Sequence, residues 1–412
     1  MQRGKPDLSC QNKFIPIDFS RQILPGTFEF ALSHIVDNRL DLSGFDAWYQ
    51  NDKRGAAAYP PTVMLKIILL GYAHGLVSSR RIAQACETNI TFMSLSGDVQ
   101  PHYTSIASFV AKMSEQIAPL FTQILMICDE EGLIGRNMFA IDGCKIKSNA
   151  SKEWSGTFEE LERKQVKLEK ASKRILSRHQ SQDIMPEDEV THDLKQKEKL
   201  DKSAAKIADY LATKKEKLGS KGKPVKSNIT DPDSAKMTTS KGTIQGYNGI
   251  AINDDKHQII LQAQTWGSVG EQQTLKPAIT QLEEQLKALG TPNTLSEAKF
   301  TADSGFHSEE NLKYLATTGL DSYIADTQFR SRNPLFKVSE TYHTDKMRIK
   351  IDSPIGRRQY SKRLSAIEPV FGNITVNKGM NKFTLRGQEK VNAQWQMYCI
   401  VHNIEKLRNS LH

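Results

Sequence analysis

Two short apolar runs that each end in an aspartate constrain this chain more than any other feature. Phe139-Ala-Ile-Asp142 and Phe300-Thr-Ala-Asp303 have the length and composition of buried β-strands. A third acid, Glu368, follows a basic run with helical character. Carboxylates at the ends of central strands lie where open α/β sheets bind ligands. The chain is therefore expected to fold as a mixed α/β domain built around these two strands.

The three acids indicate a metal-dependent chemistry. Carboxylates supply the hard oxygen ligands that Mg²⁺ and Mn²⁺ prefer. Two such ions can activate a water and stabilise the leaving oxygen in a phosphodiester displacement. The net charge of +9 and the pI near 9.1 favour a polyanionic partner such as nucleic acid. Each acid is a weak signal alone, since Asp303 also fits a turn cap and Glu368 a solvated surface helix.

Residues 1–135 are expected to form a helical N-terminal DNA-binding domain. Apolar residues recur at steps of three and four in the segments 27–36, 61–71, 78–86, 105–113 and 117–130. Short helices in series are typical of helix-turn-helix-like modules, and a plain helical bundle is the structural alternative. The apolar run 63–72 contains Lys66 and is too short to span a membrane, so it predicts a core helix.

The α/β domain is expected over 136–151 and 227–412, interrupted by a charged helical insertion at 152–226. Narrow apolar stripes separated by Lys and Glu predict two helices folded back as a hairpin, with a solvated linker as the alternative. The Lys-rich faces of this insertion fit either a DNA backbone or plain solvent. Further along, the sequence predicts a β-hairpin over 242–265, a helix over 271–289 and a strand over 320–325. Because a residue before proline disfavours the α conformation, Glu368 is expected at a helix break before Pro369.

The cysteines and the N-terminal segment indicate the cellular compartment in which the protein is expected. The five cysteines lie far apart without a CxxC pair, so neither a zinc knuckle nor a disulfide framework is expected. No apolar segment of the signal-peptide kind follows the N-terminus. These features favour a cytoplasmic protein that associates with the nucleoid through DNA.

The chain resembles bacterial insertion-sequence transposases of the DDE superfamily, especially the eleven-eighty-two group, which is related to the insertion-sequence four and five groups. The likeness runs over nearly the whole chain and is most specific in the blocks 302–312 and 367–372. The supporting blocks are 14–18, 59–66, 138–143, 231–237, 246–248 and 395–407.

The resemblance implies an RNase H-like catalytic fold in which Asp142, Asp303 and Glu368 hold two Mg²⁺ or Mn²⁺ ions, with Asp142 bridging both. It implies cutting of double-stranded DNA at terminal inverted repeats, followed by attack of the freed 3′-hydroxyl on target DNA. Because two DNA ends must be brought together, a homodimer on DNA is expected, and no membrane partner.

Further residues near the acids are candidates for contacts with DNA. They are Lys145, Lys147, Tyr247, Asn248, His307, Arg358, Tyr360, Arg363 and Lys378. By the alternation of a strand, Lys145 and Lys147 face away from Asp142. A buried, packed side chain is the alternative for Tyr247, and a half-buried loop histidine for His307.

The chain departs from the pattern of related groups around the last acid. Tyr360 and Arg363 keep their spacing, but Glu368 arrives one residue late and Lys378 lies beyond the usual lysine position. A cysteine cluster that some members carry between the second Asp and the Glu is absent here, so no zinc is expected.

Two other functions remain open beside a DNA transposase. One is a decayed or domesticated relative that binds DNA without cutting it. The presence of all three acids argues against this alternative. The other is a different RNase H-like nuclease, such as a junction resolvase, which the long helical N-terminal region and the charged insertion disfavour.

Overall fold

The computed structural model describes residues 16–49, 57–181, 186–219, 222–239, 242–267, 270–329 and 342–411. The helices of the N-terminal region are α1 (Phe28–Asn38), α2 (Pro61–Ala73), α3 (Ser79–Thr88), α4 (Ile90–Ser96), α5 (Tyr103–Lys112) and α6 (Ile117–Glu130). The later helices are α7 (Phe158–Ser181), α8 (Glu187–Thr213), α9 (Glu271–Ala288), α10 (Thr294–Glu297), α11 (Glu309–Thr318), α12 (Tyr342–Asp352), α13 (Pro354–Gly372) and α14 (Gln388–Leu407). The strands are β1 (Met138–Lys147), β2 (Ser155–Gly156), β3 (Ser227–Asn228), β4 (Ala235–Thr239), β5 (Gly242–Asp254), β6 (Ile260–Trp266), β7 (Lys299–Ala302) and β8 (Asp321–Ile324).

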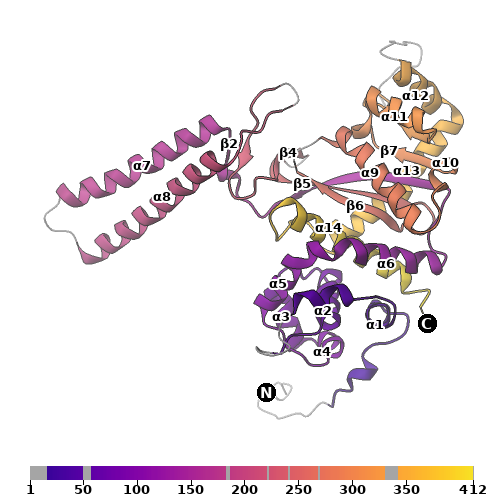
Figure 1. The fold of residues 1–412 in the computed structure, drawn as a ribbon, viewed down its shortest axis with the longest axis horizontal. Coiled ribbons are helices and arrows are strands. Elements are labelled where there is room, and N and C mark those ends of the chain that lie inside the picture. The colour runs from indigo at the N-terminus through magenta and orange to yellow at the C-terminus, as the bar shows by residue number, and fades with distance from the viewer. Residues whose placement is uncertain are drawn as a thin grey trace, which may run out of the picture.

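A mixed sheet forms the centre of the molecule (Figure 1). Its order is β4-β5-β1-β7-β8, and β6 also pairs with β5. The strand β1 is antiparallel to β5 and parallel to β7, while β8 is parallel to β7. The apolar runs of β1 and β7 are fully buried, as expected for parallel strands covered on both faces. The mixed α/β architecture expected from the sequence is thus confirmed.

Side chains of β1 alternate between two helical layers. Met138 and Ala140 pack against Ala366 and Ile367 of α13, while Phe139 joins the main core on the other face. Continuing this alternation places Asp142 on the α13 side of the sheet. Lys145 approaches α9 instead, so the prediction that it faces away from Asp142 is confirmed.

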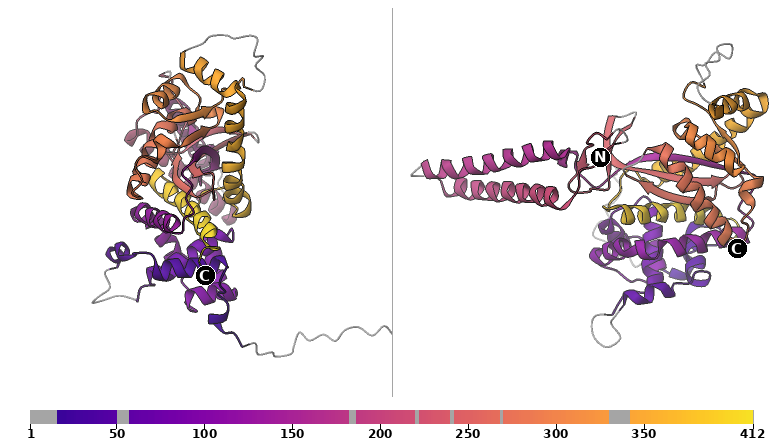
Figure 2. Two further views of the ribbon diagram at one scale, coloured as in Figure 1. Left: turned by 90° about the vertical axis from the view of Figure 1, so that its right-hand side faces the viewer. Right: turned by 45° about the horizontal axis from the view of Figure 1, so that its top comes forward.

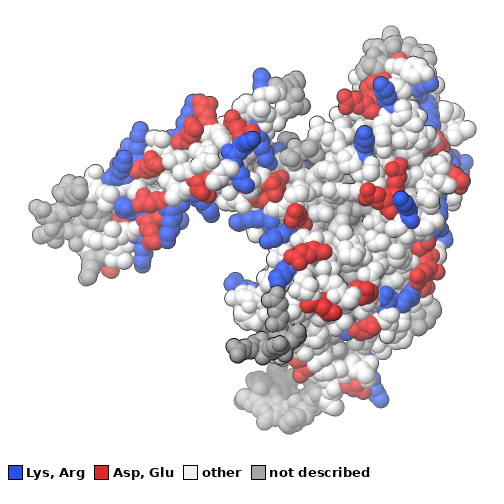
Figure 3. Space-filling model, in the orientation of Figure 1, with Lys and Arg blue, Asp and Glu red and all other residues white. Residues whose placement is uncertain are grey.

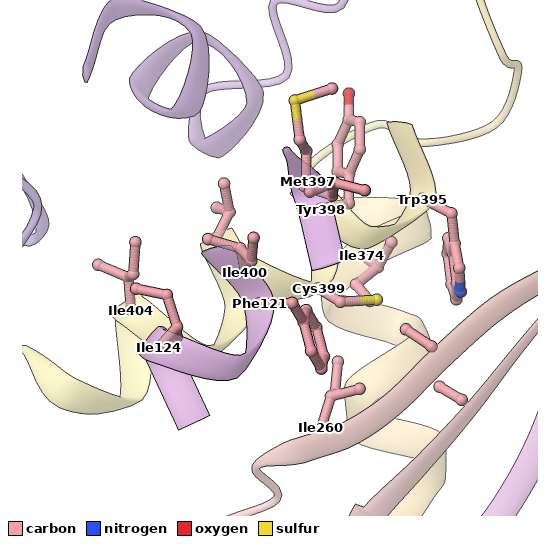
Figure 4. Close-up of a cluster of buried hydrophobic side chains, with 14 of the residues drawn as sticks. Phe121, Ile124, Ile260, Ile374, Trp395, Met397, Tyr398, Cys399, Ile400 and Ile404 are labelled. Atoms are coloured by element: carbon pink, nitrogen blue, oxygen red, sulfur yellow. The ribbon is translucent and has the colours of Figure 1, made fainter. Parts of the chain in front are cut away.

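The C-terminal helix α14 is buried on nearly all sides. It packs against α6, α2 and α1 of the N-terminal region and against β6 of the sheet. Figure 4 shows Phe121 and Ile124 of α6 and Ile260 of β6 around Cys399 and Ile400 of α14. The N-terminal helices and the sheet therefore share one hydrophobic core through this helix.

Aromatic contacts fix α14 on both sides. The ring of Tyr398 stacks on Tyr72 of α2, with the ring centroids 4.4 Å apart. The indole of Trp395 lies flat over Gly249, where a Cβ would lie only 3.2 Å from the ring, and its Nε1 donates to the carbonyl of Ile250 at 3.0 Å. This close approach favours glycine at position 249, because any larger residue would push the helix off the strand.

Amide side chains of α14 pair with the outer edge of β6. Asn403 accepts from the N–H of Ile260 and donates to its carbonyl, both at 2.9 Å. Further along, Gln396 donates to the carbonyl of Ala263, and Asn392 and Gln388 pair with the backbone of Thr265. An edge strand normally leaves such groups unpaired. Here the helix supplies the partners that another strand would provide.

The helices α7 and α8 form an antiparallel hairpin that projects from the body (Figures 1 and 2). A small core at its root holds Leu161, Ile207, Tyr210 and Ile229, separate from the main core. The short pair β2–β3 ties the two ends of the insertion together.

Two details of the helices differ from the sequence prediction. The helix α4 was missed, because it has only seven residues before Gly97 ends it in the left-handed conformation. Glu368 does not lie at a helix break, since α13 continues through Pro369 to Gly372. The proline removes the hydrogen bond to the carbonyl of Ser365, and the side chain of Gln258 donates to that carbonyl instead at 3.0 Å. In the described part of the chain, no helix is both long and apolar enough for a membrane span.

Replacing Asn403 by Ala is expected to destabilise the whole fold. The change leaves the N–H and the carbonyl of Ile260 unpaired and buried, which costs roughly 2–4 kcal/mol of unfolding free energy. Urea denaturation measures this loss. The same substitution at exposed Asn409 is the matched control and should change the free energy by less than about 0.5 kcal/mol. Equal effects of the two substitutions would show that the amide pairing contributes nothing.

Candidate active site

Asp142 lies in the middle of β1, with 22% of its side chain exposed. Its Oδ1 accepts from the N–H of Gly143 at 2.7 Å. Its Oδ2 accepts from Nη1 of Arg363 at 2.9 Å. Arg363 comes from α13, and only 11% of its side chain is exposed. The carboxylate is therefore held in place by its own backbone and by a nearly buried guanidinium.

Asp303 follows directly after β7. Its Oδ1 accepts from the N–H of Gly305 at 2.6 Å and so closes a tight turn. Because Ile141 pairs with Ala302 in the parallel register of β1 and β7, the two aspartates occupy equivalent positions on neighbouring strands. The structure thus brings Asp142 and Asp303 to the same end of the sheet.

The two carboxylates influence one another. Burial, with a smaller contribution from the nearby charge of Asp303, raises the pKa of Asp142 to about 6. The hydrogen bond from Gly143 and the positive charge of Arg363 act in the opposite direction. A half-buried carboxyl group with incompletely balanced negative charge beside it is a suitable environment for a cation.

Glu368 does not join this pair. Its side chain is exposed on α13, whereas Arg363, Ala366, Ile367 and Val370 form the buried stripe of that helix. Five residues separate it from Arg363, which turns it by about 140° around the helix. Among the described residues, no group of three acidic, histidine or cysteine side chains is close enough to hold a metal ion. The structure therefore brings together two of the three predicted acids.

Another acid, Glu271 at the start of α9, lies against the turn of Asp303. A Cβ on Gly305 would overlap with Oε2 of Glu271. Its Oε1 accepts from Nδ2 of Asn248 at 3.2 Å and lies 3.9 Å from Nζ of Lys145. These residues line a groove of about 500 Å³ next to the turn of Asp303. Sequence reasoning missed Glu271, although its place at a helix start, after two glycines, could have marked it.

Several predicted DNA-contact residues lie near this end of the sheet. Lys145, Lys147 and Arg358 are exposed. His307 is half-buried in the loop after Asp303, and its carbonyl accepts from Gln272. The ring of Tyr360 is half-buried between Phe329 and the guanidinium of Arg363.

Other predicted DNA-contact residues are enclosed by the protein, and the prediction is corrected for these. Tyr247 is fully buried, and its hydroxyl donates to Oδ1 of Asp231 at 2.7 Å. Lys378 is 2% exposed, and its Nζ donates a hydrogen bond to Oε2 of Glu405 at 2.7 Å. Asn248 is also buried, and its amide donates to Glu271. Tyrosine packing and a buried ion pair explain these positions without DNA.

The residues present fit a divalent cation in part. Asp142 and Asp303 are oxygen donors on neighbouring strands, and the pKa of Asp142 is raised mainly by burial and in smaller part by the charge of Asp303. Arg363 now balances that charge, and Glu368 contributes no oxygen in this arrangement. Two carboxylates are thus ready to hold an ion, while the third donor is not in place.

Two family models match separate segments of the chain. Residues 18–112, covering α1 to α5, match a family described as "Transposase domain (DUF772)". Residues 327–408, covering α12 to α14 and including Glu368, match a family described as "Transposase DDE domain". Asp142 and Asp303 lie outside both segments. No curated protein and no solved structure matches the chain significantly.

Cation binding is expected to follow the ionisation of Asp142. Since burial raises the pKa of this carboxyl group to about 6, protons compete with Mg²⁺ for it at lower pH. The affinity for Mg²⁺, measured by titration calorimetry, should rise by up to about tenfold per unit as the pH increases towards 6 and level off above it. A flat profile, or an unchanged profile in Asp142→Asn, would contradict this.

Replacing Gly305 by Ala is expected to displace Glu271 rather than unfold the protein. The added Cβ meets the flexible end of that side chain. The backbone of Gly305 is not in the left-handed region, so alanine introduces no backbone strain. A double-mutant cycle of unfolding free energies with Glu271→Ala should give a coupling energy of about 0.5–1.5 kcal/mol. Simple additivity of the two changes would exclude the contact.

Proposed function

We propose that the chain is a DNA transposase that cuts DNA at the terminal inverted repeats of its element and joins the 3′ ends to target DNA. Two separate segments match transposase families, one of them the transposase DDE domain, which supports this proposal. The observation that carries this proposal is the pair Asp142 and Asp303 at neighbouring strand ends. The charge of Asp303 helps to raise the pKa of Asp142, as expected where two carboxylates serve one reaction centre.

The topology supports an RNase H-like catalytic fold. The strand with the first acid is central, two antiparallel strands follow it on one side, and two parallel strands lie on the other. The second acid follows the first of those parallel strands, and α13 covers the sheet beside both acids. The helical N-terminal region is proposed to recognise the terminal repeats, in keeping with its match to a transposase domain.

Asp142, Asp303 and Glu368 are proposed as the ligands of two Mg²⁺ or Mn²⁺ ions. The ions, when bound, activate water and stabilise the leaving oxygen. Bringing Glu368 to the other two acids requires α13 to shift or turn against β1. The ion pair between Arg363 and Asp142 and the packing of Ala366 and Ile367 on β1 hold α13 in its present position, so both must rearrange for this shift.

Arg363 has a second use once it leaves Asp142. A guanidinium is always charged and binds phosphate through two parallel hydrogen bonds. Its Nε has no hydrogen-bond partner within the described residues, so it has donor capacity to spare. Arg363 is therefore proposed to neutralise Asp142 in the free protein and a DNA phosphate in the complex.

Glu271 is proposed as a positioning residue for this site. It packs on the turn that carries Asp303 and holds Asn248, and it lies near the exposed Lys145. The groove between these residues presents the ammonium group of Lys145 and the amide of Asn248 beside the proposed reaction centre.

Replacing Asp142 by Asn is expected to abolish cutting while DNA binding persists. Losing a residue next to a metal ligand typically costs 10- to 100-fold, so losing a ligand should cost more than about a hundredfold. The assay is nicking of a duplex that carries the element's terminal repeat in the presence of Mg²⁺. Asp255→Asn, at an exposed position, is the matched control and should retain full activity.

Glu368→Gln tests the third ligand separately. If α13 shifts on DNA, this variant should lose cutting as fully as Asp142→Asn. Full activity of Glu368→Gln would remove it from the site. Absence of nicking by the unchanged protein would favour a relative that only binds DNA, and a preference for branched junctions over repeat ends would favour a resolvase.

A further inference from the structure

The hairpin α7–α8 leaves the sheet at the end where the two aspartates lie. The strand β1 ends five residues beyond Asp142, and the chain then enters the hairpin through β2 at Phe158 and returns through β3 to β4. Five residues of strand span about 17 Å. In Figures 1 and 2 the hairpin extends away from the body on this side. DNA held at the aspartates would therefore have the hairpin beside it.

The middle of this hairpin is rich in positive charge. Residues 163–178 and 195–206 contain twelve Lys and Arg against three Asp and Glu. This surplus of nine equals the net charge of the whole chain, so all the remaining residues together are balanced. Acidic residues are again frequent at the root of the hairpin and at residues 187–189. Residues 357–390, with eight Lys and Arg against two Glu, form another basic segment. The middle of the hairpin is therefore one basic region of the chain, suited to a polyanionic partner.

The lysines of α8 form one stripe on the outer edge of the hairpin. Lys195, Lys199, Lys202 and Lys206 follow one another at steps of four, three and four, which places them on one helical face. All four are exposed. The residues that pack towards α7 lie on the opposite side of α8, among them Ala204 and Ile207. The stripe spans eleven residues, or about 16 Å along the helix axis.

The helix α7 carries a matching stripe. Lys167, Lys170 and Arg174 are exposed at steps of three and four. They lie opposite Leu161 and Ser172, which face α8. Figure 3 shows Lys and Arg along both outer edges of the hairpin, with acidic groups among them. The two stripes therefore point in opposite directions.

Few of these cations are used by the protein itself. Lys202 pairs with Glu198 at 2.6 Å. Within the part of the chain that the structure describes, Lys167, Lys170, Arg174, Lys195, Lys199 and Lys206 have no ion pair. Aligned like charges repel one another along a helix, so such a stripe weakens the free hairpin slightly. Phosphates would remove this repulsion.

We propose that the two outer edges of the hairpin bind DNA backbone, the α8 stripe following the duplex that leaves the aspartates and the α7 stripe a separate stretch of DNA. The spacing fits, because duplex DNA carries one charge per about 1.7 Å of its axis, so each stripe meets many phosphates. The contacts carry no sequence information and add affinity only. This inference rests on the proposed function for the position of the DNA, but its test does not require cutting.

The test compares DNA binding by three variants of the full-length protein without divalent metal. One removes charge from the α8 stripe (Lys195, Lys199 and Lys206→Gln), and another replaces the same residues by Arg. The matched control changes three exposed lysines on other helices (Lys287, Lys313 and Lys390→Gln). Glutamine and arginine both favour helices, so the hairpin is retained, which circular dichroism verifies.

Affinity is measured by fluorescence anisotropy at several salt concentrations, on a duplex long enough to pass the hairpin and on one that ends before it. The α8 glutamine variant should bind the long duplex at least tenfold more weakly, with a salt slope lower by about 2–3. It should bind the short duplex normally, and the Arg variant and the control should match the parent on both.

Parent-like binding and slope of the α8 glutamine variant on the long duplex would overturn the proposal, as would an equal loss in the control. A separate variant with Lys167, Lys170 and Arg174→Gln tests the α7 stripe. The measurement is the binding of a second labelled duplex to the protein already bound to the first, and this variant should bind the second duplex more weakly than the parent. If no variant cuts DNA but these binding differences hold, the proposed cutting fails while the DNA-binding edges stand.

Discussion

The fold depends on the helix α14 meeting two demands at once. Its apolar residues fill the core between the N-terminal helices and the sheet, and its amides pair the free edge of β6. An apolar helix that covers an edge strand would bury the unpaired N–H and C=O groups of that strand. The helix that fills the core must therefore also supply hydrogen-bond partners for these groups. Asn403 resolves this conflict by bonding both backbone groups of Ile260. The consequence is that the N-terminal region is packed against the central sheet through this helix.

The rigid sheet in turn fixes Asp142 and Asp303. Parallel pairing of β1 with β7 aligns their ends, and burial of both strands keeps the alignment. The helix α13 is held against this sheet by the packing of Ala366 and Ile367 on β1 and by the ion pair from Arg363 to Asp142. Breaking a buried pair is costly unless each charge finds another partner. Under the proposed function, a cation for Asp142 and a phosphate for Arg363 would be such partners.

Periodicity in the sequence predicted the elements well. The spacing of apolar residues located α1, α2, α3, α5 and α6, and period-two alternation placed Asp142 and Lys145 on opposite faces of β1. The prediction failed at Pro369, because the local preference against a helix was offset by a side chain more than a hundred residues away. Local rules cannot include a hydrogen bond from Gln258, which arrives only when the chain has folded.

In the candidate site, too, some features could be predicted from local sequence pattern and others could not. Residue types and spacing were enough to single out the two aspartates and the basic character around them, since both follow from short-range pattern. They did not show that Tyr247 and Lys378 are enclosed, that Glu271 lies against the Asp303 turn, or that Glu368 points away from it.

The sequence by itself determined which residues share a strand face or a helix stripe, which two strands carry the aspartates, and how much positive charge the chain carries. Only the tertiary structure decided which of those faces meet and where the charge is displayed. The physical reason is that periodicity defines a side of an element, while burial, ion pairing and exposure depend on the neighbour that packs against that side.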